Sequence, residues 1–274
     1  MTCSAPPRGT LDVYDPWSDA IDNNPCGKPT LMSLPSGVDV SADSLCAFHY
    51  EMKYGQQVMA QRGIDQYTVL CLHADSLQDA CGHPLTALGD AQVSTAQSKF
   101  GGASFAFDGV GDYLSSPDSP DWALGGGDFT IDLWIYYTNP TTNTQMLIGQ
   151  FPGSPGQYSW CLRQDTGILK LYLSPDGTTL PGPPQWAWNP TAATWYHYAI
   201  VRSGNNVMHF INGTQNGSTA SFTGPIYDTP LPLTIGANAN GSWIFAGGFM
   251  DEIRVSRGIA RWTQNFAVPT APYS

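Results

Sequence analysis

Glutamate and lysine are scarce in this chain, and their scarcity argues against a helical protein. Glutamate occurs only at Glu51 and Glu252, although Asp and Glu together number 22. Only four of the 11 cationic residues are lysines. Exposed helix positions favour Glu and Lys, whereas turns favour Asp. Gly 29 and Pro 22 are abundant, and both disfavour regular helices. The composition therefore predicts β structure with many turns.

The shortage of positive charge excludes one class of partner. The formal net charge is −11, and binding to nucleic-acid phosphates requires Lys and Arg. We therefore expect no nucleic-acid partner, and divalent cations suit this charge better. No apolar run approaches the roughly 18 residues that span a bilayer, so no membrane span is expected. Residues 1–8 lack the apolar segment of a secretory signal, so we expect synthesis and folding in the cytosol.

The six cysteines do not form a Cys-x-x-Cys pair, so the sequence gives little support to a zinc site. A chain that folds in the cytosol keeps its thiols reduced. We interpret the cysteines as free thiols that are buried as small apolar groups. They are Cys3, Cys26, Cys46, Cys71, Cys81 and Cys161.

The first 65 residues differ from the rest of the chain. Residues 1–65 contain many prolines between polar residues, and only a short helix near residues 54–61 is expected there. This stretch has too few periodic apolar residues to build its own core. We interpret it as an irregular N-terminal arm for particle attachment or oligomerisation. A second interpretation remains open, in which the arm wraps around the chain's own folded domain.

Residues 66–274 alternate short apolar runs with turn signals, which predicts an all-β sandwich or jelly roll. Asn212-Gly213 follows an apolar run and predicts a hairpin, because a type I′ turn needs two residues with positive φ. The expected strands cover residues 67–73, 104–107, 129–137, 146–151, 158–163, 169–173, 196–202, 207–211, 233–235 and 249–255.

Five segments in order resemble one family. They are Val93-Ser-Thr-Ala-Gln-Ser-Lys-Phe-Gly-Gly-Ala-Ser with Phe107-Asp-Gly-Val-Gly-Asp-Tyr-Leu, Gly127-Asp-Phe-Thr-Ile-Asp-Leu-Trp-Ile-Tyr, Trp195-Tyr-His-Tyr-Ala-Ile-Val-Arg, Phe210-Ile-Asn-Gly and Phe249-Met-Asp-Glu-Ile-Arg-Val-Ser-Arg-Gly-Ile-Ala-Arg-Trp. Together they resemble the concanavalin A-like lectin/glucanase domains of laminin-G-like type. The first segment is most similar to domains of tailed-phage structural proteins. The resemblance implies a concanavalin A-like jelly-roll β-sandwich over about three quarters of the chain.

The resemblance also implies a place for the protein. We expect a phage virion structural protein, made in the host cytoplasm, that displays the sandwich outward as a capsid decoration or a small tail-associated accessory. Its partners would be capsid or tail subunits and further copies of itself in a homo-oligomer, with a host-surface glycan as ligand. A carbohydrate-binding module or a tail-fibre adhesin is the alternative, and a glycoside hydrolase is a third, less favoured one.

Glycosidases of this fold carry Glu-x-Asp-x-Glu on one strand, because a period of two points all three carboxylates at the sugar. This chain has no such triplet, and its two glutamates lie far apart. Asp132 and neighbouring aspartates could replace it in principle, and this alternative is disfavoured. His197 lies in an apolar strand, where packing is a better explanation than catalysis. The sequence therefore predicts no catalytic residue and no enzyme activity.

Asp251 is the candidate metal ligand. Strict alternation along 249–255 places Asp251 on the same face as Phe249, Ile253 and Val255, where an unpaired carboxylate is costly. In the resembling fold, an aspartate of the last strand often binds a structural calcium ion together with oxygens of early loops. The resemblance thus implies a Ca²⁺ site at Asp251, with Asp108 or Gly109 as further ligands. The alternative is that Asp251 accepts hydrogen bonds from turn amides.

Three loop tryptophans are candidates for glycan binding, because aromatic rings stack on the C–H faces of sugars. Trp186 and Trp188 lie in a proline-rich segment that cannot form a central strand. Trp243 follows Asn240-Gly241. The alternative is that all three rings close the ends of the sandwich core, since large aromatic side chains are usually buried.

Overall fold

The structure is a computed structural model that describes residues 11–14, 29–32, 64–140, 144–152 and 155–274. The chain divides into two compact units, Met1–Arg62 and Gly63–Ser274. In the first unit β1 (Leu11–Tyr14) pairs antiparallel with β2 (Pro29–Met32), a pairing that the prediction of an irregular arm did not include. The helix expected at residues 54–61 lies outside the described residues.

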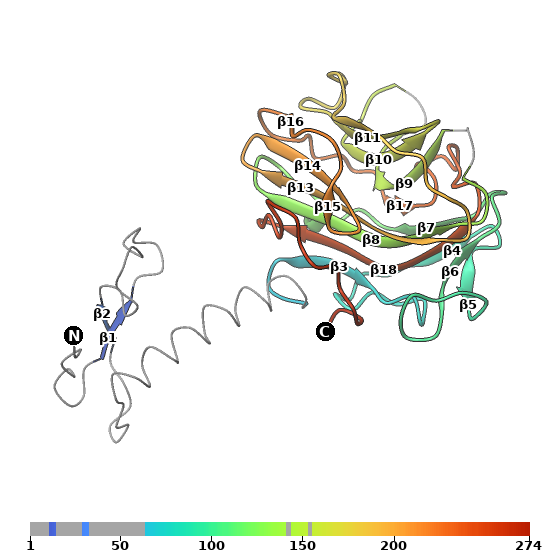
Figure 1. The fold of residues 1–274 in the computed structure, drawn as a ribbon. Helices are drawn as coiled ribbons and strands as arrows, with labels where there is room; N and C mark the ends of the chain where they lie inside the picture. The colour runs from blue at the N-terminus through green and yellow to red at the C-terminus, as the bar shows by residue number, and fades with distance from the viewer. Residues whose placement is uncertain (1–10, 15–28, 33–63, 141–143, 153–154) are drawn as a thin grey trace. The chain divides into compact units, whose positions relative to one another are not determined.

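The second unit consists of two antiparallel sheets (Figure 1), as predicted for a concanavalin A-like jelly-roll sandwich. The seven-stranded sheet has the order β12-β11-β10-β9-β17-β7-β4, and its strands are Gln185–Ala187, Ile168–Leu173, Trp160–Asp165, Gln145–Gln150, Leu233–Ile235, Tyr113–Ser116 and Thr86–Leu88. Among the described residues the one helical element is a short 3-10 turn, η1 (Pro120–Trp122).

The nine-stranded sheet has the order β15-β14-β13-β8-β18-β6-β5, with β16 paired to β14 and β3 paired to β18. In that order its strands are Thr214–Gln215, Asn206–Ile211, Trp195–Ser203, Phe129–Tyr137, Gly248–Arg257, Ser104–Phe107 and Gln92–Ser94, followed by β16 (Ala220–Ser221) and β3 (Thr68–Leu72).

The core lies between the two sheets and follows the alternation of the strands. In β8 every second side chain is buried in the main hydrophobic cluster, namely Phe129, Ile131, Leu133, Ile135 and Tyr137. The intervening side chains, among them Asp132 and Tyr136, therefore project from the outer face of the nine-stranded sheet. Because of this alternation, only the side chains that point outward from β8 can contribute to a binding site on this sheet.

All ten predicted strands are present, with ends that differ by at most about two residues. The hairpin at Asn212-Gly213 is confirmed, with φ of 48° and 76° at its two positions. The strands that the sequence missed are short. Among the described residues no helix is long and apolar enough to cross a membrane. Cys71, Cys81 and Cys161 are free thiols, and the other three cysteines lie outside the described residues.

Candidate functional site

Three aromatic side chains form a row across the outer face of the nine-stranded sheet. Trp195 of β13 lies directly opposite Tyr136 of β8, and Tyr136 lies opposite Phe249 of β18. The ring centroids are 5.4 Å apart for Trp195 and Tyr136 and 5.8 Å apart for Tyr136 and Phe249. All three side chains are half-buried, so part of each ring meets solvent. We call these residues the aromatic row.

The same register continues past the row into a pocket. Ala106 of β6 lies opposite Phe249, and Gln92 of β5 lies opposite Ala106. The pocket has a volume of about 570 Å³. Its lining residues are Asp90, Ala91, Gln92, Ala106, Phe107, Asp108, Asp112 and Phe249. Phe249 thus belongs to both the row and the pocket, which makes one continuous surface.

Asp112 fixes the loops around this pocket. Its carboxylate accepts hydrogen bonds from the backbone N–H of Asp90 at 2.5 Å and of Asp108 at 2.7 Å. Burial raises the pKa of Asp112. The side chains of Asp90 and Asp108 are exposed, as is that of Gln92. The pocket therefore presents carboxylate acceptors and one amide, which are groups that hydrogen-bond to hydroxyls.

Gly109, proposed from the sequence as a metal ligand together with Asp108, packs closely against a second loop. Its φ is +91°, and a Cβ at this position would lie 2.9 Å from the carbonyl oxygen of Ala246. Glycine is required there because the backbone packs against another loop. Asp108 accepts a hydrogen bond from Val110 N–H at 2.7 Å and lines the pocket.

The alternation that was expected around Asp251 is wrong. β18 has a register shift between Asp251 and Arg254, and Glu252 has a φ of 47°. This β-bulge inserts one residue, so Met250, Ile253 and Val255 face the core and Asp251 does not share their face. Because Phe249 and Met250 are both apolar, the sequence does not reveal which of them shares the core face with Ile253, and the bulge is hidden.

The Asp251 carboxylate caps backbone amides. One oxygen accepts hydrogen bonds from the N–H groups of Lys99 at 2.7 Å and Phe100 at 3.1 Å, and the other accepts from Glu252 N–H at 2.8 Å. Burial raises the pKa of Asp251 to about 7. A calcium ion needs oxygen lone pairs around it, whereas three amide donors converge here. Within the described part of the chain no group of three or more His, Cys, Asp or Glu residues could hold a metal ion. The residues around Asp251 do not fit calcium.

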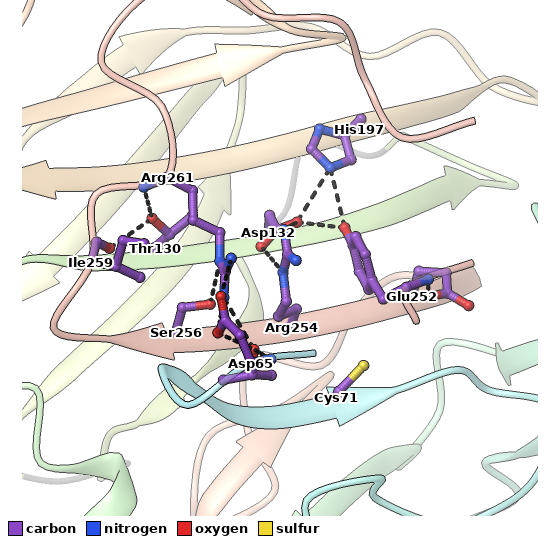
Figure 2. A network of polar contacts seen from close by, with 12 residues as sticks. Asp65, Cys71, Thr130, Asp132, His197, Glu252, Arg254, Ser256, Ile259 and Arg261 are labelled. Atoms are coloured by element: carbon purple, nitrogen blue, oxygen red, sulfur yellow. Dashed lines mark hydrogen bonds and ion pairs between the residues drawn. The ribbon is translucent and has the colours of Figure 1, made fainter. Parts of the chain in front are cut away.

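Asp132 is inaccessible to substrate. Both of its oxygens bind the Arg254 guanidinium, at 3.0 Å from Nε and 3.1 Å from Nη2, and it also accepts from the Tyr273 hydroxyl. Figure 2 shows Arg254 and His197 converging on this carboxylate. Burial opposes ionisation, but Arg254 and His197 hold the pKa of Asp132 below its usual range. This carboxylate is fully buried and ion-paired, and it holds Tyr273 of the C-terminal segment, so it serves to stabilise the fold.

Glu252 is engaged in a similar way. Its carboxylate accepts a hydrogen bond from Tyr273 N–H at 2.9 Å and lies 3.0 Å from Nδ1 of His73. The hydrogen bond to Glu252 raises the pKa of His73. Cys71 lies 3.9 Å from the same imidazole, but burial raises the pKa of its thiol, so this thiol is a poor nucleophile. The chemistry of a catalytic triad is therefore not available here.

The structure separates the three candidate tryptophans. Trp186 is only 4% exposed, belongs to the main hydrophobic cluster, and donates its indole N–H to Ser218 O. Trp188 donates to the Tyr198 hydroxyl and packs against the core. These two rings have their polar edge and most of their surface occupied by protein.

Trp243 lies elsewhere, in a cluster with Phe151 on the other sheet. Its ring is 5.6 Å from Phe151, and the Arg163 guanidinium lies 4.8 Å from its centroid. Trp243 has a φ of 54°, unusual for a bulky side chain. It is half-buried like Trp195, but the Arg163 guanidinium and the Phe151 ring lie against its ring.

The sequence did not predict the aromatic row, because the tryptophans that it singled out lie in segments expected to be loops. Trp195, Tyr136 and Phe249 lie within strands, and only the pairing of β13, β8 and β18 brings them together. The alternation of β8 was a usable signal, since Tyr136 lies between two core residues and must point outward.

Comparisons with known proteins agree with the geometry. The model of the concanavalin A-like lectin/glucanases superfamily matches residues 108–261. No curated protein matches the sequence. Among solved structures, the binding domain of Paraclostridial Mosquitocidal Protein 1 is similar with a TM-score of 0.53 and 12% identity over 71% of this chain and 50% of that one.

Two further solved structures are similar. The receptor binding domain of botulinum neurotoxin C/D mosaic serotype has a TM-score of 0.55 and 13% identity over 72% of this chain and 50% of that one. The binding domain of botulinum neurotoxin DC in complex with rat synaptotagmin II has a TM-score of 0.52 and 14% identity over 71% and 49%. The chain spans about half the length of these neighbours. Identities this low show a shared fold alone.

Proposed function

The chain belongs to the concanavalin A-like lectin/glucanase superfamily, and from that membership we propose that it is a non-catalytic glycan-binding protein whose ligand lies on the aromatic row. The observation that carries this proposal is the row itself, with Trp195, Tyr136 and Phe249 on opposed positions of three neighbouring strands. Partly exposed rings on a rigid sheet offer stacking surfaces that need no reordering on binding.

The absence of catalysis is the second part of the proposal. Asp132, Asp251 and Glu252 are all committed to internal hydrogen bonds. A retaining glycosidase needs two carboxyl groups about 5 Å apart beside the scissile bond, one of them able to hold a proton near neutral pH. Asp90 and Asp108 lie at the pocket, but both side chains are exposed, so neither is enclosed by apolar groups as the general acid of such a site is.

The third part concerns the particle. The resemblance of residues 93–104 to tailed-phage structural proteins supports a place in a virion, as a capsid decoration or a tail-associated accessory. The first unit, residues 1–62, which makes up most of the predicted arm of residues 1–65, would attach the protein to capsid or tail subunits or to neighbouring copies. The solved neighbours are binding domains of toxins, which supports outward display of the sandwich toward a host-surface glycan.

A glycan array tests this proposal. The full-length protein, labelled at its N-terminus, is applied beside Trp195→Ala and Trp243→Ala. We expect the wild type and Trp243→Ala to bind the same glycans and Trp195→Ala to lose about fivefold in affinity, because stacked rings contribute on the order of 1 kcal/mol each. Circular dichroism confirms that each variant is folded.

The two tryptophans are a matched pair, since both are half-buried, and Trp243 packs against Met146 and Cys161 of the other sheet. Equal binding by wild type and Trp195→Ala would place the ligand elsewhere. An array on which the wild type binds no glycan would contradict the proposal and leave a protein receptor as the ligand to seek.

A further inference from the structure

Resting on the proposed function, we infer that the aromatic row binds a single extended chain of uncharged pyranose units, one ring to each unit, with the end of the chain in the Asp90–Asp108 pocket. The inference concerns three properties of the ligand: its length, its physical state and its charge. Each follows from a separate observation on the row or the pocket.

The spacing of the rings sets the length. Directly opposed residues on neighbouring strands are separated by the strand spacing of about 4.8 Å. The observed centroid separations of 5.4 Å and 5.8 Å are close to the length of one pyranose unit in an extended chain. Three rings in line therefore contact three successive units, and Phe249 contacts the unit that enters the pocket.

The tilt of the rings indicates whether the ligand is a single soluble chain or the surface of a crystalline polysaccharide. The planes of Trp195 and Tyr136 differ by 55°, and those of Tyr136 and Phe249 differ by 73°. A crystalline polysaccharide surface is flat and needs coplanar rings beneath it. A single chain rotates from one sugar to the next and can follow rings whose planes change. The row therefore fits soluble chains and does not fit a crystal face.

The pocket sets the charge. It is lined by Asp90, Asp108 and Asp112, and its described lining includes no Lys, Arg or His. A sugar that carries a carboxylate would bring a like charge into this pocket, which is unfavourable. Sugar hydroxyl and N-acetyl N–H groups can donate to the exposed carboxylates of Asp90 and Asp108. Gln92 can donate to and accept from the same sugar at the junction with the row.

Isothermal titration with defined oligosaccharides tests the inference. The probes are cello-, manno- and chito-oligosaccharides and oligogalacturonates, each from disaccharide to hexasaccharide, together with microcrystalline cellulose and chitin in pull-down. We expect one neutral series to bind, with Kd falling roughly fivefold from disaccharide to trisaccharide and levelling off for longer chains. Oligogalacturonates and the crystalline solids should not bind.

Two variants test where the ligand binds and whether the pocket carboxylates exclude negatively charged sugars. Phe249→Ala should weaken the neutral trisaccharide at least fivefold while Trp243→Ala has no effect. The double variant Asp90→Asn, Asp108→Asn should bind oligogalacturonate more tightly than the wild type, because it removes two exposed carboxylates. Asp228→Asn, an exposed aspartate outside the pocket lining, is the control for this charge change.

The outcomes distinguish this inference from the proposed function. The inference would be overturned if the wild type bound oligogalacturonate or a crystalline solid more tightly than the neutral oligosaccharides. It would also be overturned if affinity did not rise from disaccharide to trisaccharide. Both results would leave glycan binding standing. No binding of any probe, combined with an array without signal, would overturn the proposed function and the inference together.

Discussion

Buried carboxylates in this protein are held by donors from distant parts of the chain. Asp132 of β8 binds Arg254 of β18 and Tyr273 near the C-terminus. Asp251 binds the amides of Lys99 and Phe100. Removing one partner of a buried ion pair leaves the other charge uncompensated, and a buried amide without an acceptor also costs free energy. Single substitutions should therefore produce large effects on stability.

Asp132→Asn tests the structural role of the ion pair. The substitution removes the carboxylate that neutralises Arg254, and both side chains are fully buried. We expect the free energy of unfolding to fall by about 3 to 5 kcal/mol, measured by urea denaturation. Asp228→Asn, at an exposed position, should change it by less than about 0.5 kcal/mol. Glycan turnover by the wild type that the Asp132 variant abolished would instead indicate a catalytic role.

Asp251 should impose a pH dependence on stability. Its folded pKa is raised to about 7 from the ordinary value of 3.8, so between these values the folded chain holds a proton that the unfolded chain has released. This contribution to stability is fully present below about pH 4 and is lost as the pH rises through about 7. As the pH rises from about 4 to about 7, the melting temperature of the wild type should therefore fall relative to that of the Asp251→Asn variant.

The same melting curves test for calcium. Because amide donors occupy the Asp251 carboxylate, EDTA should leave the melting temperature of the wild type unchanged at every pH. A fall in melting temperature with EDTA that Asp251→Asn abolishes would show that this residue binds a cation after all.

At the scale of elements, the turn between β14 and β15 anchors the C-terminal segment. Phe266 N–H donates to Gly213 O at 2.8 Å. A Cβ on Gly213, where φ is +76°, would lie 2.0 Å from Phe266 O. Gly213→Ala should therefore destabilise the protein by about 1 to 3 kcal/mol more than backbone strain alone.

The control for this prediction is Gly111→Ala. Gly111 has a similar φ of +78°, but a Cβ there would meet nothing within 4 Å. Urea denaturation compares the two variants. Equal losses of stability would mean that the contact with the C-terminal segment contributes nothing beyond the left-handed backbone.

The sequence predicted elements well where the apolar pattern is long. β8, with nine residues, begins and ends where the pattern placed it, and the Asn212-Gly213 turn has the expected backbone. Strands of two to four residues such as β5 and β12 were missed, because so few residues carry no resolvable period. The β18 bulge and the aromatic row depend on which strands pair, and pairing between distant strands is not encoded in local spacing.

At the scale of the whole molecule, the sandwich begins earlier than the composition suggested. Ile64 N–H donates to Ser274 O at 3.0 Å, and Asp65 binds the Arg261 guanidinium at 2.8 Å (Figure 2). These contacts tie the start of the sandwich unit to its end. A fragment that begins at residue 66 would lack them, so the fragment for study is 63–274.

Fragment 63–274 should fold and melt within a few degrees of the full chain, because its sheets and core are complete in the described residues. We further expect that the fragment fails to attach to phage particles that lack the protein, whereas the full chain attaches. Circular dichroism and co-sedimentation measure the two properties. Attachment of the fragment would assign that role to the sandwich, and an unfolded fragment would make residues 1–62 part of the core.

The central claim, that the aromatic row binds glycan, is tested most directly by the indole N–H resonances of the 9 tryptophans. Single Trp→Phe variants assign the signals of Trp195 and Trp243 in the ¹⁵N-labelled protein, which is then titrated with the best glycan of the array. The account predicts that the Trp195 resonance shifts in a saturable manner while the Trp243 resonance stays in place. A saturable shift of Trp243 with an unmoved Trp195 resonance would contradict it.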